Sequence, residues 1–306
     1  MGQGGPVRLG VYLRPQALGE ALDALRRTPL AVLAGGTDFY PARVGKPLDD
    51  DVLDITAIEA LRGIERRDGG WRIGALATWT DLLRAGLPPA FDGLKSGARE
   101  VGGMQIQNAG TIVGNICNAS PAADGVPGLL TLDASVELAS AAGSRSVPLA
   151  EFITGNRQTV RGADELVTGI VIPEPGAGAQ SAFLKLGARR YLVISIVMAA
   201  VLIVPEGGTV GRAAVAVGAC SPVARRLAAL EAALAGRPLD GALGEAVGPE
   251  HIAAVLAPLD DVRGSADYRN DAALTMLRRG LSALGARLRS GHGGHSGHSG
   301  NGAGGR

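Results

Sequence analysis

Cysteine is scarce in this sequence. The 306 residues include two cysteines, Cys117 and Cys220, which are too few for a disulfide framework or for a cluster held by four thiolates. The chain therefore supplies no iron–sulfur site of its own, and we expect it to work in a reducing, cytoplasmic environment. We interpret Cys117, which has no partner cysteine near it in the sequence, as a small buried residue and not as a redox thiol.

Net charge and long apolar runs are also lacking. The formal net charge is +1, so no strong field favours nucleic acid or a membrane surface as a partner. The longest apolar run, Ile194 to Pro205, is shorter than the ~20 residues that a membrane-spanning helix needs. Met1 to Leu13 lacks a basic start followed by an apolar core, so we expect no secretory signal.

Apolar spacing predicts a βαβ unit over residues 7–60, because runs of a few apolar residues alternate with a stretch of helical periodicity. Its expected elements are a helix with Leu18, Ala21, Leu22 and Leu25 on one face, strands over 30–33 and 52–55, and a short helix that Thr37 or Asp38 caps and that runs to about Val44.

Residues 61–173 are typical of a mixed α+β region, in which turn residues separate short alternating runs. A segment poor in regular periodicity, 102–127, interrupts this pattern, and loops of that length inside a compact domain are usually functional. The expected elements are a hairpin of 64–67 and 71–75 around Asp68-Gly69-Gly70, a helix from Thr78 or Thr80 to about Ala85, a helix over 94–101, and strands over 129–139 and 165–172.

The segment 173–178, rich in proline and glycine, is typical of a linker. Beyond it we expect a small α+β domain, followed by a disordered tail over 290–306 that consists almost wholly of glycine, serine and histidine. The elements predicted for this domain are strands over 182–186, 196–204 and 210–219 and helices over 223–235, 241–256 and 268–288.

Glycine is abundant and gathers in two loops. The first, Ala34-Gly35-Gly36-Thr37-Asp38, follows a predicted strand, and successive N–H groups there can form a nest for an anion such as a diphosphate. Gly-Gly alone is more typical of a tight turn without a ligand. The second loop, 107–124, places Asn, Gln, Ser and Thr among small residues, which suits phosphate and ribose oxygens.

These two loops, together with Phe183-Leu184-Lys185-Leu186-Gly187-Ala188-Arg189-Arg190, resemble the FAD-binding medium subunit of the molybdenum hydroxylases. The resemblance extends from about Val7 to Leu288. It implies an α+β fold in which residues 1–175 form a vanillyl-alcohol-oxidase-type FAD-binding domain with subdomains of about 1–60 and 61–175. It further implies a C-terminal domain over 180–289 with a three-stranded antiparallel sheet and a helix bundle.

The resemblance also implies a set of FAD-binding residues. The two loops would hold the diphosphate and ribose, while Gly102 and Gly103 would let the chain pass close to the cofactor. Asp124 and Lys185 match positions near the flavin, and Tyr191 is a candidate to cover one flavin face. The residues expected to bind FAD are Val32, Leu33, Ala34, Gly35, Gly36, Thr37, Asp38, Phe39, Gly102, Gly103, Thr111, Ile112, Val113, Gly114, Asn115, Asp124, Lys185 and Tyr191.

Alternatives stay open at several of these positions. Asp124 is also placed to cap a helix from Val126, and Lys185 is equally typical of a surface lysine on an edge strand. A positive charge beside the flavin, from Lys185 or from Arg189 or Arg190, would raise the flavin potential. Val113 stands where family members commonly carry glycine. The four histidines, 251, 292, 295 and 298, lie far from both loops in the sequence, so FAD is expected to be bound non-covalently.

The resemblance implies an electron-transfer subunit with no catalytic residue or metal site of its own. Its partners would be a large subunit with the molybdenum cofactor and a small iron–sulfur subunit, in a dimer of heterotrimers, and its electrons would pass to NAD or another acceptor. A stand-alone FAD-dependent reductase or oxidase, and an assembly subunit that has lost its cofactor, are the alternatives. A nicotinamide-binding Rossmann domain is disfavoured because no third glycine follows Gly35-Gly36 at the required distance.

Overall fold

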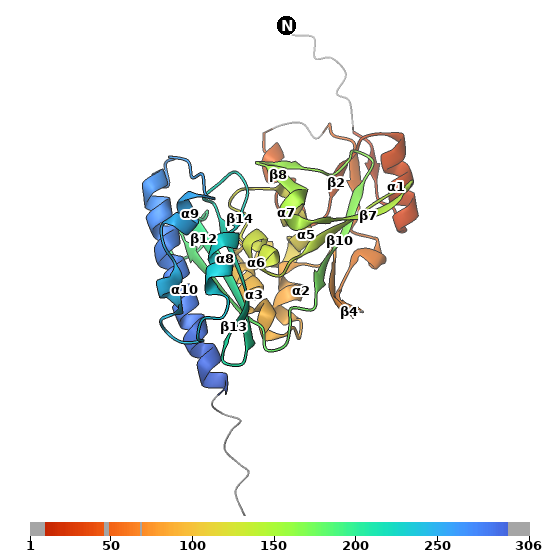
Figure 1. Cartoon of the computed structure of the whole chain (residues 1–306). Coiled ribbons are helices and arrows are strands. Elements are labelled where there is room, and N and C mark those ends of the chain that lie inside the picture. Colours follow the sequence, from red (N-terminus) through yellow and green to blue (C-terminus); the bar gives the residue numbers. More distant parts are fainter. Residues whose placement is uncertain (1–9, 46–48, 68, 293–306) are drawn as a thin grey trace, which may run out of the picture.

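The computed structural model describes residues 10–45, 49–67 and 69–292, and Figure 1 shows how their helices and strands are arranged. Within these ranges no helix is both long and apolar enough to cross a membrane. The fold is α+β throughout, with a parallel three-stranded sheet, an antiparallel five-stranded sheet and a C-terminal antiparallel sheet as its main layers.

The first subdomain is the predicted βαβ unit. Its strands β1 (Tyr12–Leu13), β3 (Val52–Asp54) and β2 (Ala31–Leu33) pair in parallel in that spatial order. Helix α1 (Leu18–Arg27) joins the first two in sequence and buries Ala21 and Leu25, which confirms the expected apolar face.

The helix that we expected Thr37 or Asp38 to cap does not form. After β2 the chain makes turns, and only one short 3-10 helix, η1 (Pro41–Arg43), follows. Pro41 has no N–H to donate, and Gly45 has φ +75°, a left-handed conformation that ends the turn. Thr37 and Asp38 thus remain outside any helix.

The second subdomain contains a sheet with the strand order β4-β5-β10-β6-β7. The predicted hairpin is confirmed by the antiparallel pair β4–β5, although Asp68 lies outside the described residues. The predicted helix ends also hold, because Thr78 caps α2 through its hydroxyl and Ala85 ends it. The strands and the two helices are β4 (Ile64–Arg67), β5 (Gly70–Gly74), β6 (Ser135–Ser140), β7 (Gly143–Pro148), β10 (Leu166–Pro173), α2 (Trp79–Arg84) and α3 (Asp92–Glu100).

The segment 102–127 is largely helical, contrary to the irregular loop that we expected. It contains α4 (Met104–Ala109), α5 (Ile112–Asn118) and the start of α6 (Gly125–Thr131). All seven residues of α6 are buried, so this helix shows no polar face and no helical periodicity. For the same reason 129–139 is wrong as a single strand, because α6 occupies its first part before β6 begins.

Four further elements that the sequence did not predict lie between β6 and β10. They are β7, α7 (Leu149–Phe152), β8 (Ile153–Gly155) and β9 (Gln158–Thr159). Strand β7 is exposed along most of its length, so its residues carry no apolar alternation.

The C-terminal domain has four strands where three were predicted. Their order is β11-β12-β13-β14, all antiparallel, and the short β14 (Arg225–Arg226) occupies the start of the helix expected over 223–235. The other elements are β11 (Gln180–Leu186), β12 (Val197–Glu206), β13 (Thr209–Gly218), α8 (Ala228–Leu234), η4 (Leu243–Ala246), α9 (Glu250–Ala253) and α10 (Ala266–His292).

Two helix predictions in this domain need correction. Gly248 and Pro249 break the helix expected over 241–256 into the two short helices η4 and α9. Helix α10 continues to His292, so the disordered tail expected from residue 290 is wrong for 290–292, and residues 293–306 lie outside the described part of the chain.

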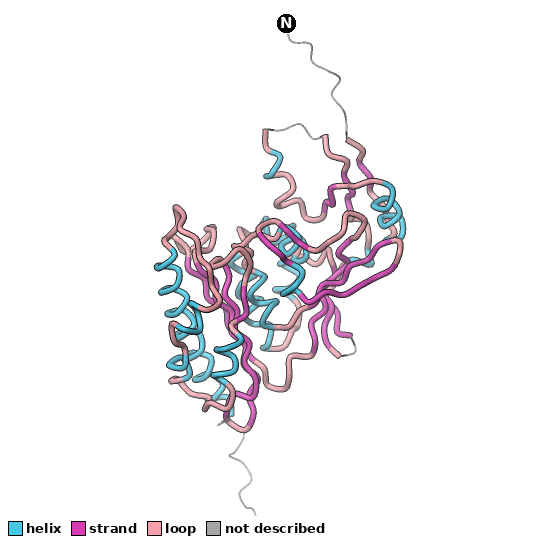
Figure 2. The backbone as a smooth tube through the Cα atoms, turned by 45° about the horizontal axis from the view of Figure 1, so that its top comes forward, coloured by secondary structure: helices cyan, strands magenta, loops and turns pink. Residues whose placement is uncertain are grey.

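The C-terminal sheet is covered on both faces, as Figure 2 shows. Helices α8 and α10 pack on one face, while α3 and α6 of the second subdomain pack on the other. Side chains alternate along β12 accordingly, because Leu202 joins the core of the first two subdomains whereas Val201 and Ile203 join the core under α10. This shared sheet holds the C-terminal domain firmly against the second subdomain.

Candidate functional site

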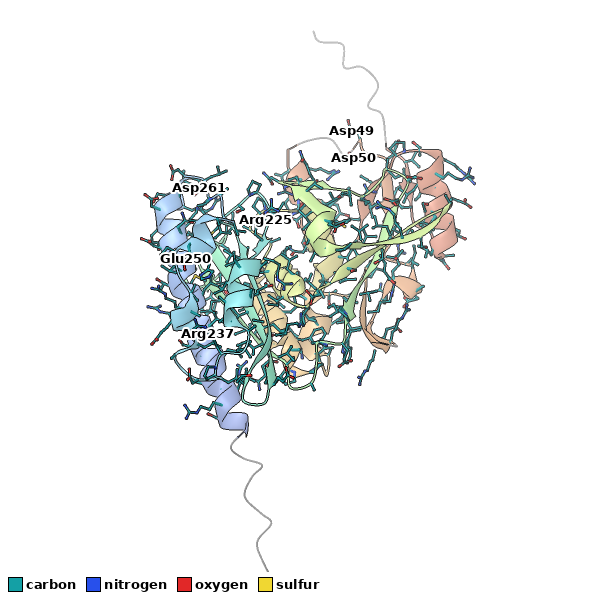
Figure 3. The ribbon with its side chains drawn as sticks, in the orientation of Figure 1. Asp49, Asp50, Arg225, Arg237, Glu250 and Asp261 are labelled. Atoms are coloured by element: carbon teal, nitrogen blue, oxygen red, sulfur yellow. The ribbon has the colours of Figure 1, made fainter. Side chains whose placement is uncertain are left out.

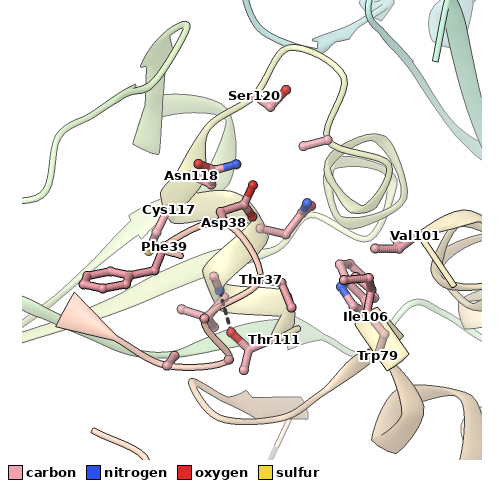
Figure 4. A pocket seen from close by; sticks show the side chains of 18 of the residues that line it. Thr37, Asp38, Phe39, Trp79, Val101, Ile106, Thr111, Cys117, Asn118 and Ser120 are labelled. Carbon is pink, nitrogen blue, oxygen red and sulfur yellow. Dashed lines mark hydrogen bonds between the residues drawn. The ribbon is translucent and has the colours of Figure 1, made fainter. Parts of the chain in front are cut away.

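A cavity of about 790 Å³ opens where the two glycine loops meet a segment of the C-terminal domain, residues 192–194. Figure 4 shows its wall, with Thr37, Asp38 and Phe39 from the first loop facing Thr111, Cys117 and Asn118 from the second. The predicted residues that line it are Val32, Ala34, Gly35, Gly36, Thr37, Asp38, Phe39, Gly102, Thr111, Val113, Gly114, Asn115 and Asp124. The structure therefore brings together both loops, which are separated by some seventy residues of sequence.

Five predicted residues do not line this cavity. Leu33 and Ile112 are buried in the core behind the loops. Gly103 lies just before α4, and the side chain of Lys185 points to Asp124. Tyr191 is 65% exposed, with the Arg190 guanidinium 5.5 Å from its ring centroid.

The two loops touch through their backbones. A β-carbon added at Gly35 would lie 1.9 Å from the carbonyl oxygen of Ala109, so only glycine allows this approach. Gly36 has φ +73°, a left-handed conformation that turns the chain away after the contact. Glycine is therefore needed at position 35 for the close approach and at position 36 for the left-handed backbone, and both residues shape the cavity wall.

The first loop has unpaired backbone donors. Within the described part of the chain, no acceptor receives the N–H groups of Gly35, Gly36 or Thr37. Backbone N–H groups are strong donors that are almost always paired when they are buried. Three consecutive free donors beside a cavity fit the phosphate oxygens of a ligand.

The second loop owes its shape to Thr111, which caps α5. Its hydroxyl oxygen accepts a hydrogen bond of 2.9 Å from the Gly114 N–H. Ile112 and Ile116 anchor the helix in the core. Val113 lies inside this helix and not in a left-handed turn, so the valine at this position causes no backbone strain.

Asn115 supplies an unsatisfied polar atom. Its carboxamide oxygen is buried and has no hydrogen-bond partner among the described residues. Asn115 lines the cavity, and a buried acceptor left unpaired costs about 1–3 kcal/mol. The oxygen itself has almost no accessible surface and lies beside Gly125 at the start of α6, so it does not face the cavity.

Asp124 and Lys185 form a buried ion pair. The Lys185 ammonium lies 2.7 Å from Asp124 Oδ2, and the two side chains are 7% and 11% exposed. Asp124 Oδ1 accepts a second bond of 2.6 Å from the Ser195 hydroxyl. Burial raises the pKa of Asp124, and the nearby Lys185 charge opposes that shift.

This geometry excludes two alternatives that the sequence left open, a helix-capping role for Asp124 and a surface position for Lys185. Asp124 stands at the N-cap of α6, yet its side chain makes no capping hydrogen bond. Lys185 does lie on an edge strand, β11, but its side chain is buried and also donates to the Glu100 carbonyl oxygen at 3.3 Å.

Sequence reasoning missed three arginines that line the cavity, Arg43, Arg157 and Arg161. Arg43 pairs with Asp50, which is labelled in Figure 3, whereas Arg157 and Arg161 have no carboxylate within salt-bridge distance among the described residues. The β8–β9 hairpin and the loop after it carry the last two. No strand was predicted there, so nothing in the sequence indicated that these charges reach the cavity.

Cys117 is exposed toward this cavity, which corrects the expectation of a buried residue. Protein atoms surround the thiol closely, and this poor solvation of the thiolate raises its pKa to about 12. The thiol therefore stays protonated at neutral pH. None of the residues that line the cavity is a histidine.

Comparisons with known proteins agree with this architecture. A family model described as the FAD binding domain in molybdopterin dehydrogenase matches residues 6–175, and the CO dehydrogenase flavoprotein C-terminal domain matches residues 182–284. The nicotinate dehydrogenase FAD-subunit of Eubacterium barkeri is 37% identical over 196 residues, which are 61% of this chain and 66%, just under two thirds, of that subunit.

Two further relatives match along most of their length. The xanthine dehydrogenase FAD-binding subunit of Escherichia coli O157:H7 is 30% identical over 276 residues, 89% of this chain and 94% of that subunit. A chain of carbon monoxide dehydrogenase from Hydrogenophaga pseudoflava superimposes with a TM-score of 0.81 at 30% identity, covering 90% of this chain and 97% of that one.

The fold and the cavity define an FAD-binding oxidoreductase subunit of two domains. The chain belongs to the family of FAD-binding medium subunits of the molybdenum hydroxylases. Its cofactor is FAD, and the free backbone donors of the first loop fit the phosphate groups of such a ligand.

Proposed function

We propose that this chain holds FAD non-covalently in the cavity between its two glycine loops and passes electrons from a partner's iron–sulfur clusters to NAD or another acceptor. The observation that carries this proposal is the row of free N–H groups at Gly35, Gly36 and Thr37, three residues that line a cavity of about 790 Å³. The absence of a histidine among the residues that line this cavity supports non-covalent binding.

In this proposal each wall of the cavity has its own part. The first loop and the capped start of α5 bind the diphosphate and ribose. The residues Val32 to Phe39 and Thr111 to Asn115 contact these groups or support the residues that do. Asp124 lies toward the flavin end, and Gly102 leaves room for the cofactor. Tyr191 would have to fold over from its exposed position to cover a flavin face.

Bound flavin supplies the capacity to take up electrons singly and to deliver them in pairs. The protein's own residues bind it, orient it and set the charge around it. We further propose a large molybdenum-cofactor subunit and a small iron–sulfur subunit as partners in a dimer of heterotrimers. Support for a molybdenum partner comes from the relatives named above, one of which is an FAD-subunit of a dehydrogenase and another a chain of a carbon monoxide dehydrogenase described by its molybdenum cofactor.

Titration of the purified apoprotein with FAD tests the cofactor site. We expect one FAD per chain, quenching of flavin fluorescence on binding, and release of free FAD on acid denaturation. A chain that takes up no FAD would overturn the proposal.

The relay itself is tested in the complex. Co-purification of the tagged chain is expected to bring down one large molybdenum subunit and one small iron–sulfur subunit. Substrate-dependent reduction of NAD or a dye is expected in the complex but not with the isolated chain. Oxidase or reductase turnover by the isolated chain at the rate of the complex would favour the stand-alone alternative.

A further inference from the structure

Three polar side chains meet between the cavity and the C-terminal domain. Asp124 immediately precedes α6, Lys185 lies on β11, and Ser195 stands just before β12. Both carboxylate oxygens of Asp124 are used, one by Lys185 at 2.7 Å and one by Ser195 at 2.6 Å. Asp124, a residue of the cavity wall, thus forms hydrogen bonds to two segments of the C-terminal domain.

Ser195 directly follows the three residues through which the C-terminal domain lines the cavity, Leu192, Val193 and Ile194. This segment is strained, because Leu192 has φ +52°, a left-handed conformation that is costly for leucine. Two hydrogen bonds within the C-terminal domain hold its backbone. The Arg189 guanidinium donates to the Leu192 carbonyl oxygen, and the Ile196 N–H donates to the Leu186 carbonyl oxygen. The Ser195–Asp124 bond ties it to the FAD-binding domain.

We propose that Asp124, Lys185 and Ser195 form a charge-neutral clasp that holds residues 192–194 as one wall of the FAD cavity, and that Lys185 influences the flavin only through Asp124. The inference rests on the proposed function, since it presumes that FAD occupies this cavity. The role expected for Lys185 changes accordingly, because its charge is neutralised by the Asp124 carboxylate and does not act on the flavin directly.

The electrostatics of the clasp follow from its burial. With the two side chains 7% and 11% exposed, removal of either charge leaves the other buried and unpaired. The charged groups that face Asp124 are Lys185 from β11 and Glu100 from α3, and the negative charge of Glu100 further raises the pKa of Asp124. Without Lys185, the Asp124 carboxyl would therefore hold its proton to higher pH.

Charge variants of the full-length flavoprotein test the neutral pair through the flavin midpoint potential. D124N leaves an unpaired cation beside the flavin, so its potential is expected to be more positive than that of the wild type. K185M leaves an unpaired carboxylate, so its potential is expected to be more negative at high pH and to return to the wild-type value at low pH, where Asp124 is protonated. The double variant, neutral at both positions, is expected to match the wild type at every pH.

A direct action of Lys185 on the flavin predicts a different pattern. In that case K185M lowers the potential by the same amount at every pH, and the double variant behaves like K185M. Either of these results would overturn the proposal.

The wall-holding role is tested by S195A, which removes a hydrogen bond without changing any charge. Loss of one bond to a carboxylate is expected to weaken FAD binding by about tenfold, equivalent to ~1.4 kcal/mol. The matched control is R212M, because Arg212 on β13 also forms an ion pair across the two domains, with Asp133, but neither residue lines the cavity. R212M is expected to leave the FAD affinity unchanged, and an S195A affinity equal to that of R212M contradicts the clasp.

A readout without FAD separates this inference from the proposed function. Trypsin can cleave after the exposed Arg189 and Arg190, next to the clasped segment. In the apoprotein, D124N and S195A are expected to be cleaved there several-fold faster than the wild type and R212M. Equal cleavage rates would count against the clasp even if FAD binds, whereas failure of the wild type to bind FAD would count against the proposed function alone.

Discussion

Gly35 approaches Ala109 so closely that a β-carbon at position 35 would lie 1.9 Å from the Ala109 carbonyl oxygen. This contact joins the two glycine loops, and both of them line the cavity. Glycine at position 35 is thus a requirement of the loop–loop contact as well as of the ligand.

Gly35→Ala is expected to push the loops apart and to raise the dissociation constant for FAD by more than about tenfold, or ~1.4 kcal/mol. Flavin fluorescence titration of the apoprotein measures this effect. Gly19→Ala is the matched control, since no atom lies within 4 Å of a β-carbon there and position 19 is inside α1. That variant is expected to stabilise the helix by about 1 kcal/mol and to leave FAD binding intact. Equal affinities of the two variants would show that the contact is dispensable.

Thr111→Ala is expected to destabilise the protein because it removes the cap of α5, in which the threonine hydroxyl oxygen accepts from the Gly114 N–H. Loss of such a cap costs about 1 kcal/mol, and we expect a fall in melting temperature of about 2–4 °C. FAD affinity should fall as well, since Thr111 and Gly114 line the cavity. Thr111→Ser keeps the hydroxyl and should behave like the wild type. A serine variant as unstable as the alanine variant would contradict the capping role.

Arg161→Gln is expected to weaken FAD binding by about tenfold, because a cavity cation without a carboxylate partner is available to an anionic ligand. Arg161 also donates to the carbonyl oxygens of Gly162 and Glu165, at 3.0 and 2.7 Å, so a structural effect must be separated from a charge effect. Titrations at several salt concentrations do so, since screening weakens only the charge effect. Arg161→Lys should retain most of the affinity and the salt dependence. If the glutamine variant keeps the wild-type salt dependence, the charge does not act on FAD.

Cys117 is expected to react slowly with iodoacetamide although it is exposed to the cavity. Its pKa of about 12 lies well above the ~8.5 of a free cysteine, and the thiolate is the reactive form. At pH 8 we expect alkylation at least about a hundredfold slower than in the denatured chain, with the rate rising steadily as the pH is raised toward 12. Peptide mass spectrometry after timed labelling distinguishes Cys117 from Cys220. Labelling of Cys117 in the folded apoprotein at the rate of the denatured chain would contradict the raised pKa.

Much of the fold follows from local sequence patterns. The amphipathic face of α1, the hydroxyl cap at Thr78 and the glycine turn between β4 and β5 act within a few residues of chain, so they can be predicted without tertiary information. The predictions failed where tertiary packing decides the structure. Helix α6 is buried on every side, and β14 is a strand only because β13 offers it an edge.

The two glycine loops, the order of the motifs and the family to which they point can all be recognised in the sequence, because glycine spacing and short polar side chains express backbone requirements that are local. The surroundings of the cofactor cavity depend instead on the packing of the whole chain. The approach of Gly35 to Ala109, the arginines from the β8–β9 region and the ion pair of Asp124 with Lys185 join residues that are distant in sequence. Contacts of this kind depend on how whole sheets and helices pack, and no local pattern of residues records that packing.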